Sequence, residues 1–207
     1  MQPFSRVAPG DGRCFHDRST VASARQSAGF AAGQAIYLAG DDGWAWRLAA
    51  GVVRLDSVVA GGARAFASLA IPGDILGCET LLFGAYTFSA TALIPCRLVP
   101  WPEGNKAPAG ESLLASLAGA QRRAAELMAL RGGQAADRVL GLIRLLADGS
   151  GRVILPTRQD IAEITDLRFE TISRIIKGFE RAQVLGPIKL NGVHATRSFQ
   201  LLQRVAA

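Results

Sequence analysis

Residues 155–185 carry the pattern that most constrains this chain, because they predict two short amphipathic helices joined by a tight turn. Thr157 is suited to cap the first helix, expected over residues 158–164. Asp160 follows three residues later, where a carboxylate faces the positive end of the helix dipole. This arrangement is typical of a helix-turn-helix and indicates a sequence-specific DNA binder.

The second helix is predicted over residues 168–181, with Asp166 suited to cap it. Its apolar residues recur at three- and four-residue steps and should face the core: Ile172, Ile175, Ile176 and Phe179. A second helix of this kind lies in the major groove with its N-terminal part against base edges. Four outward side chains are therefore expected to read bases: Phe169, Glu170, Ser173 and Arg174. Taken singly, each would equally suit a solvated helix face.

Their chemistry suits this role. Arg174 can donate two hydrogen bonds to guanine O6 and N7, and Glu170 can accept one from the cytosine amine or brace the arginine. Ser173 is a short donor or acceptor. Other polar side chains are expected at the phosphates, which set affinity and register without carrying sequence information: Thr157, Arg158, Gln159, Arg168, Thr171, Lys177 and Lys189.

These residues closely resemble the winged-helix reader of the bacterial CRP/FNR regulator family. Residues 158–162 carry part of the resemblance. Glu170, Ser173 and Arg174 match the Glu-x-x-Ser-Arg pattern of the FNR and FixK branches, whose half-sites resemble TTGA(T/C). The cyclic-AMP receptor branch has glycine where Ser173 stands. Phe169 departs from the small or β-branched residue that FNR-like members carry beside the glutamate.

Two further segments fit that resemblance. Residues 186–194 predict a hairpin with Asn191-Gly192 at its turn, which would be the wing and would bring Lys189 near the backbone phosphates. Between residues 28 and 100, short β-branched and aromatic segments alternate with glycine turns, which predicts a sandwich or roll: 34–38, 45–48, 52–55, 65–69, 87–93 and 97–99. The glycines fall where the family's cyclic-nucleotide-binding-type β-roll has its turns.

Residues 110–147 carry the longest helical signal, and apolar residues in its first part are expected to form a dimer contact: Leu113, Leu117, Ala120, Ala124, Leu127 and Met128. Packing of this stripe on the chain's own β-roll is the alternative, and both can hold for different faces. Gly132-Gly133 predicts a hinge before a further helix over residues 135–147. The expected architecture is α+β with four parts: an N-terminal segment 1–27, a β-roll 28–108, a dimerisation helix 109–132 and a winged helix-turn-helix 133–207.

Composition agrees with a DNA partner. The net charge of +6 suits a polyanion, although basicity alone would equally suit a membrane surface or an acidic protein. The sequence has neither an apolar run of membrane-spanning length nor a signal-peptide pattern, so a cytoplasmic protein is expected. Three cysteines without Cys-x-x-Cys spacing predict no disulfide framework and no structural zinc site.

The signal that controls the protein is harder to infer. Cyclic-nucleotide-binding relatives hold the cyclic phosphate with an Arg-Ser pair, but residues 84–89 contain no arginine and Asp74 replaces the family's glutamate, so cyclic-AMP control is not expected. FNR relatives use four thiolates for a [4Fe–4S] cluster, which three cysteines exclude. A haem- or metal-dependent sensor would have to draw its ligands from the three thiols and one N-terminal histidine: Cys14, His16, Cys78 and Cys96. Buried thiols are the simpler interpretation.

The favoured interpretation is a homodimeric transcription regulator that needs no cofactor and binds TTGA(T/C)-type palindromes. The resemblance implies activation through RNA polymerase and a respiratory or low-oxygen set of genes. The alternatives are a haem- or metal-dependent gas or redox sensor and an unregulated architectural DNA-binding protein. An enzyme is not expected, because two distant histidines cannot form a cupin metal site and no nucleophile or phosphate-loop motif is present.

Overall fold

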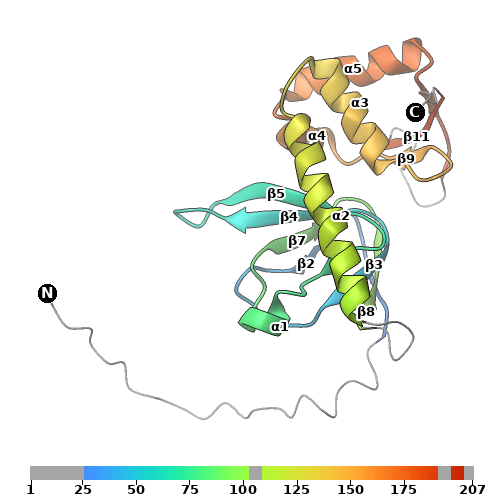
Figure 1. Cartoon of the computed structure of the whole chain (residues 1–207). Coiled ribbons are helices and arrows are strands. Elements are labelled where there is room, and N and C mark those ends of the chain that lie inside the picture. The colour runs from blue at the N-terminus through green and yellow to red at the C-terminus, as the bar shows by residue number, and fades with distance from the viewer. Residues whose placement is uncertain (1–25, 103–108, 191–196, 203–207) are drawn as a thin grey trace, which may run out of the picture.

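The computed structural model describes residues 26–102, 109–190 and 197–202. A β-roll occupies the lower part of Figure 1, a smaller helical domain occupies the upper part, and one long helix joins them. Antiparallel sheets and separate helices make this the α+β architecture expected from the sequence. None of the described helices is both long and apolar enough to cross a membrane.

The roll consists of two four-stranded antiparallel sheets. One has the order β1 (Ala28–Phe30), β8 (Cys96–Pro100), β3 (Trp46–Ala50) and β6 (Ile75–Leu76). The other has the order β2 (Ala35–Tyr37), β7 (Ser89–Ala92), β4 (Val53–Val58) and β5 (Arg64–Ala70). All six predicted strands are confirmed, whereas β1, the two-residue β6 and the one-turn helix α1 (Thr80–Phe83) were not predicted. Leu48, Val53 and Leu98 are completely buried in the roll's apolar core.

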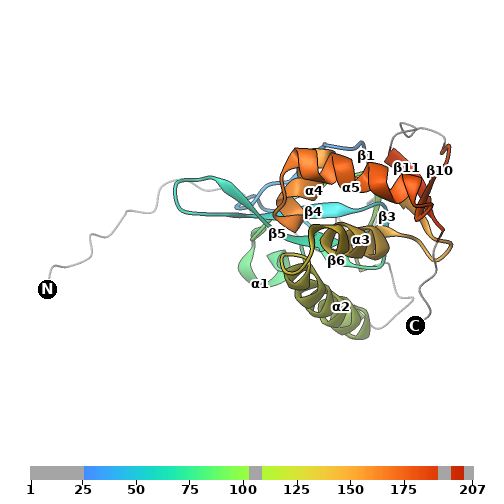
Figure 2. The same cartoon turned by 90° about the horizontal axis from the view of Figure 1, so that it is seen from above.

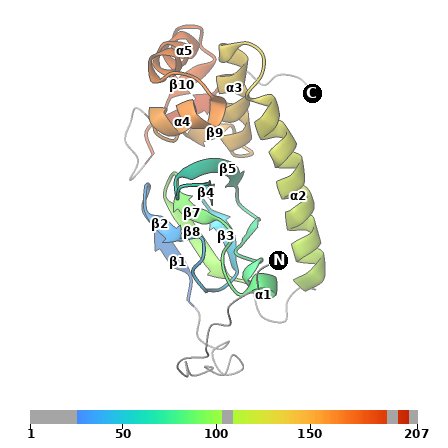
Figure 3. The same cartoon turned by 90° about the vertical axis from the view of Figure 1, so that its left-hand side faces the viewer.

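The long helix α2 (Ala109–Ala129) packs along one side of the roll (Figure 3). Its inward residues recur at steps of three and four: Leu113, Ser116, Ala120, Arg123 and Leu127. The Ser116 hydroxyl accepts a hydrogen bond from the backbone N–H of Ile75 at 2.8 Å. The buried Arg123 donates from Nε to the Leu69 carbonyl at 2.8 Å and from Nη2 to the Asp74 carboxylate. These contacts dock α2 on its own roll.

An adjacent stripe of α2 stays exposed and has the same three-and-four spacing: Leu114, Leu117, Gln121, Ala124 and Met128. Leu114 is 69% exposed and Met128 is 72% exposed. The structure therefore divides the predicted dimer set. Leu113 packs against a small cluster of the roll, and Leu127 is buried in the core of its own chain. The free apolar seam consists of Leu114, Leu117, Ala124 and Met128.

The upper domain, called here the reading domain, runs from α3 to β11. Its elements are α3 (Ala135–Leu146), β9 (Arg152–Ile154), α4 (Arg158–Thr165), α5 (Phe169–Arg181), β10 (Leu185–Pro187) and β11 (Ser198–Leu201). Gly133 has a φ of 77°, which allows the chain to reverse between α2 and α3 at the predicted hinge. The core is formed by fully buried side chains: Leu142, Ile143, Leu155, Ile161, Ile164, Ile172, Ile176 and Phe199.

The predicted wing hairpin is longer than residues 186–194. β10 pairs antiparallel with β11, with Leu185 opposite Leu201 and Pro187 opposite Phe199, so the return strand comes several residues later than expected. β11 also pairs with β9, which the sequence analysis did not predict, and completes a three-stranded sheet. The Asn191-Gly192 turn and His194 lie outside the described residues.

The buried pair between Arg123 and Asp74 gives a stability prediction. Asp74→Ala should lower the free energy of unfolding by about 3–5 kcal/mol, because it leaves a buried guanidinium without its counter-charge. Replacing both residues by apolar ones, Arg123→Met with Asp74→Leu, should cost much less. Urea unfolding followed by circular dichroism measures both. Equal losses for the single and double variants would contradict the pairing argument.

Candidate DNA-binding surface

The first helix of the helix-turn-helix, α4, begins with a complete capping box. The Thr157 hydroxyl accepts from the backbone N–H of Asp160 at 3.1 Å, and the Asp160 carboxylate accepts from the backbone N–H of Thr157 at 3.2 Å. Two otherwise unpaired N–H groups are satisfied in this way. The N-cap predicted from the sequence is therefore present.

The turn into α5 differs from the expectation in one respect. Asp166 does not cap α5; it ends α4 in the left-handed conformation, with φ 52° and ψ 51°. The N-cap of α5 is Arg168, whose side chain makes no capping hydrogen bond. Aspartate tolerates the left-handed region better than most residues, which explains its place in so tight a turn. The backbone N–H of Leu167 closes the turn on the Ala162 carbonyl at 3.0 Å.

The second helix, α5, is amphipathic, with one buried apolar side and one exposed polar side. Ile172 and Ile176 are completely buried, and Ile175 and Phe179 pack against the same core. Figure 1 shows α5 at the top of the molecule, Figure 2 shows it from above, and Figure 3 shows α4 between it and the roll. The outward side of α5 consequently faces away from the roll.

The predicted base-reading residues lie together on that outward side. Glu170, Ser173 and Arg174 are spaced by three and four residues, and Glu170 and Arg174 are exposed. Neither takes part in a side-chain hydrogen bond or ion pair within the described part of the chain. Phe169 is 49% exposed at the start of the helix, and Ser173 is half-buried. The geometry thus presents a carboxylate, a hydroxyl and a guanidinium side by side.

The residues predicted to contact phosphates differ in how exposed they are. Several of them are exposed: Thr157, Gln159, Arg168, Lys177 and Lys189. Thr171 and Arg158 are half-buried. Burial lowers the pKa of the Arg158 guanidinium; the carboxylate of Glu180 opposes this shift, and the nearby positive charge of Arg197 adds to it. Gln159 already donates to Glu163 at 3.0 Å.

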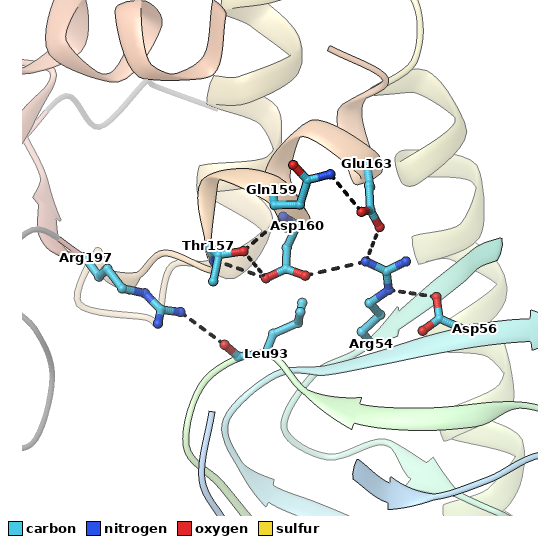
Figure 4. A network of polar contacts seen from close by, with 8 residues as sticks. All are labelled: Arg54, Asp56, Leu93, Thr157, Gln159, Asp160, Glu163 and Arg197. Carbon is cyan, nitrogen blue, oxygen red and sulfur yellow. Dashed lines mark hydrogen bonds and ion pairs between the residues drawn. The ribbon is translucent and has the colours of Figure 1, made fainter. Parts of the chain in front are cut away.

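Sequence reasoning missed two arginines that contribute to the position of the reading domain. Arg197 donates from Nε to the Leu155 carbonyl at 2.7 Å and from Nη2 to the Leu93 carbonyl of the roll at 3.2 Å. Arg54 reaches from the roll to α4 (Figure 4). Neither residue belongs to a local motif, so no periodicity or spacing could have revealed these contacts.

Comparisons with known proteins agree with this geometry, although no protein-family model matches the chain. A nitrogen fixation regulation protein, FixK of Rhizobium meliloti (strain 1021), is 30% identical over 150 residues, covering 70% of each chain. The structure of FixK2 from Bradyrhizobium japonicum has a TM-score of 0.64 at 25% identity, covering 86% of this chain and 93% of that one. A CRP/FNR-family regulator from Thermus thermophilus has a TM-score of 0.59 at 25% identity, covering 86% and 94%.

The chain belongs to the CRP/FNR family of transcription regulators. It is therefore a DNA-binding transcription regulator and not an enzyme.

Residues 84–89, where the sequence resemblance would place a cyclic-phosphate site, take part in the internal packing of the roll. The Tyr86 ring stacks on Tyr37 with centroids 3.7 Å apart, and its hydroxyl donates to the Trp44 carbonyl at 2.8 Å. The Ser89 hydroxyl accepts from the backbone N–H of Ala39 at 3.0 Å. Asp74, which stands for the family's glutamate, is paired with Arg123.

The predicted sensor residues are not brought together as far as the structure describes them. Cys14 and His16 lie outside the described residues. Burial and the nearby Glu79 carboxylate raise the pKa of the half-buried Cys78 thiol. Cys96 is buried, and its Sγ donates to the carbonyls of Ile94 at 3.1 Å and Val52 at 3.3 Å. Within the described ranges, no group of three or more His, Cys, Asp or Glu residues could hold a metal ion.

Burial raises the pKa of the Cys96 thiol from 9.0 to about 11, which predicts slow thiol–disulfide exchange. At pH 8 its thiolate fraction falls roughly 100-fold, so a Cys14→Ser, Cys78→Ser variant should react with a disulfide reagent roughly 100-fold more slowly when folded than in urea. The measurement is the absorbance of the released thiol over time. Rapid reaction of the folded variant would show that Cys96 is accessible.

Proposed function

We propose that this protein is a homodimeric activator that binds TTGA(T/C)-type palindromes through the outward side of α5. The proposal rests on one observation: Glu170, Ser173 and Arg174 share the exposed side of a helix whose other side forms the domain core. We infer respiratory or low-oxygen target genes from the similarity of this helix to FNR and FixK proteins. Contact with RNA polymerase rests on family membership, and the DNA target implies a cytoplasmic protein.

The dimer is supported by the seam on α2. Leu114, Leu117, Ala124 and Met128 keep the spacing of a coiled-coil seam while the adjacent stripe is occupied by the roll. Two copies related by a twofold axis would present two reading helices to a palindrome.

Control without a small ligand is supported by the packing of the roll. The stacked Tyr37 and Tyr86 fill the segment in which relatives bind a cyclic phosphate, and residues 84–89 contain no cation to neutralise one. We therefore propose that neither cyclic AMP nor a four-cysteine cluster is required.

Arg174→Ala tests the base-reading role. Titration of a TTGAT-N4-ATCAA duplex and a scrambled duplex by fluorescence anisotropy should show a loss of about 1–3 kcal/mol on the palindrome and little change on the scrambled DNA. Lys177→Ala is the matched control, since loss of a phosphate contact weakens both duplexes alike and reduces the salt slope by about 1. Equal weakening of both duplexes by Arg174→Ala would contradict base reading.

Titration of the wild-type protein on the same two duplexes, together with the visible absorption spectrum of the sample, distinguishes the alternatives. A colourless protein that selects the palindrome supports ligand-independent control. An absorption band of haem or an iron–sulfur cluster, or selection only after a ligand is added, would instead identify a sensor. Near-equal affinity for both duplexes with a steep salt dependence would identify an architectural DNA-binding protein.

Leu117→Lys tests the dimer seam, because it places a charge among residues that would be buried between two copies. Sedimentation velocity should show a shift from twice the chain mass of 21.8 kDa to the mass of one chain. Ala115→Lys adds the same charge at an exposed α2 position off the seam and should leave the dimer intact. A dimer that survives Leu117→Lys unchanged would place the interface elsewhere.

A further inference from the structure

The reading domain rests on the roll through an apolar contact that is incomplete. Val52, Leu69, Leu93 and Ile94 of the roll belong to the same apolar cluster as the core of the reading domain. Beside this contact lies a cavity of about 500 Å³, lined from both sides by residues that include Gly51, Ile94, Leu145 and Ile154. Apolar contact is not directional, so a contact with an open side leaves the reading domain room to tilt.

A polar network spans the same interface (Figure 4). Arg54 of β4 donates from Nη1 to Glu163 at 2.5 Å and lies 3.5 Å from Asp160, and both acidic residues belong to α4. Its Nε donates to Asp56 at 2.7 Å, which holds the guanidinium in place from the roll side. The Arg54 side chain is only 13% exposed. We call Arg54, Asp56, Asp160 and Glu163 the Arg54 clamp.

Glu163 and Arg54 both keep their charges at neutral pH. Burial opposes ionisation of Glu163, but the hydrogen bonds from Gln159 and Arg54 and the charge of Arg54 outweigh it and lower the pKa of the carboxyl. Burial also opposes the charge of Arg54, while the hydrogen bonds to Asp56 and Glu163 outweigh it and raise the pKa of the guanidinium. Partly buried ion pairs of this kind contribute geometry more reliably than net stability.

Asp160 and Glu163 are the two acidic residues of α4. α4 neighbours the helix proposed to enter the major groove, so unpaired carboxylates there would repel the DNA phosphates. Arg54 offsets part of this negative charge from the side facing the roll, since its single guanidinium contacts both carboxylates. In the same arrangement Glu170, Arg174 and Lys177 of α5 remain exposed.

We propose that Arg54 is a positioning residue for DNA binding: through Glu163 and Asp160 it holds the reading domain on the roll with the base-reading side of α5 outward. This inference rests on the proposed function. A domain that is oriented before it meets DNA loses less freedom on binding, so the clamp favours tight binding. Arg54 would thus set the orientation of the reading domain without a bound ligand.

The first measurement needs no DNA. In the full chain, with Cys14→Ser and Cys78→Ser, spin labels at Thr87→Cys of the roll and Arg144→Cys of α3 report the distance between the domains by pulsed electron resonance. Arg54→Gln should broaden this distance distribution. Arg64→Gln, which removes the same charge from an exposed position on the neighbouring strand β5, should leave the distribution unchanged. An equally narrow distribution in both variants would overturn the clamp.

The second measurement is a double-mutant cycle on the palindrome. Arg54→Gln and Glu163→Gln should each weaken binding roughly fivefold or more, and the double variant should be no weaker than Arg54→Gln alone. If the affinity losses of the two single variants multiply in the double variant, the two residues act separately. If Arg54→Gln binds the palindrome more tightly, Arg54 holds the reading domain in an orientation that disfavours DNA binding. If Arg54→Gln fails to fold, Glu163→Gln, whose side chain is 41% exposed, carries the test. A wild type that does not distinguish palindrome from scrambled DNA would defeat the proposed function but leave the distance measurement valid.

Discussion

The burial of one guanidinium determines how the rest of this protein is arranged. Arg123 lies inside the contact between α2 and the roll, where it needs both the Asp74 carboxylate and the Leu69 carbonyl. These partners determine which stripe of α2 faces inward, because a buried charge without them would be strongly unfavourable. The rotation of the helix then leaves Leu114, Leu117, Ala124 and Met128 outside. The same helix leads to the turn at Gly133 from which the reading domain starts.

Apolar and polar contacts contribute differently to the position of the reading domain. Apolar packing of Leu93 and Ile94 holds the two domains together but does not select one tilt, since burial depends on area and not on direction. Hydrogen bonds do depend on direction. Arg54 and Arg197 cross the interface with such bonds, the first to side chains of α4 and the second to a backbone carbonyl of the roll. A few polar atoms therefore set the orientation of the reading domain, whereas many apolar atoms hold it against the roll.

Local patterns were enough to predict most of the fold. The N-cap at Thr157, the three-and-four spacing of Ile172 and Ile176, and the β-branched and aromatic segments between glycine turns are local patterns, and the elements that they predicted were confirmed. Asp166 was misassigned because a carboxylate before a helix resembles an N-cap whether it caps or turns the chain. Leu127 was assigned to the dimer seam because periodicity identifies an apolar stripe but not the surface that covers it. The contact between Arg54 and Glu163 joins residues 109 positions apart, and no local pattern encodes it.

The distribution of arginines explains why net charge says little about where such a protein binds DNA. Of the basic residues behind the net charge of +6, Arg54 and Arg123 are committed to carboxylates inside the molecule, and Arg197 to backbone carbonyls. Arginine suits these places because its planar group donates in several directions at once. The cations left for a polyanion on the reading domain include Arg168, Arg174, Lys177 and Lys189, which are exposed. A basic composition therefore indicates a DNA partner only after the internally paired cations have been set aside. The position of each remaining cation along α5 then distinguishes base contacts from phosphate contacts.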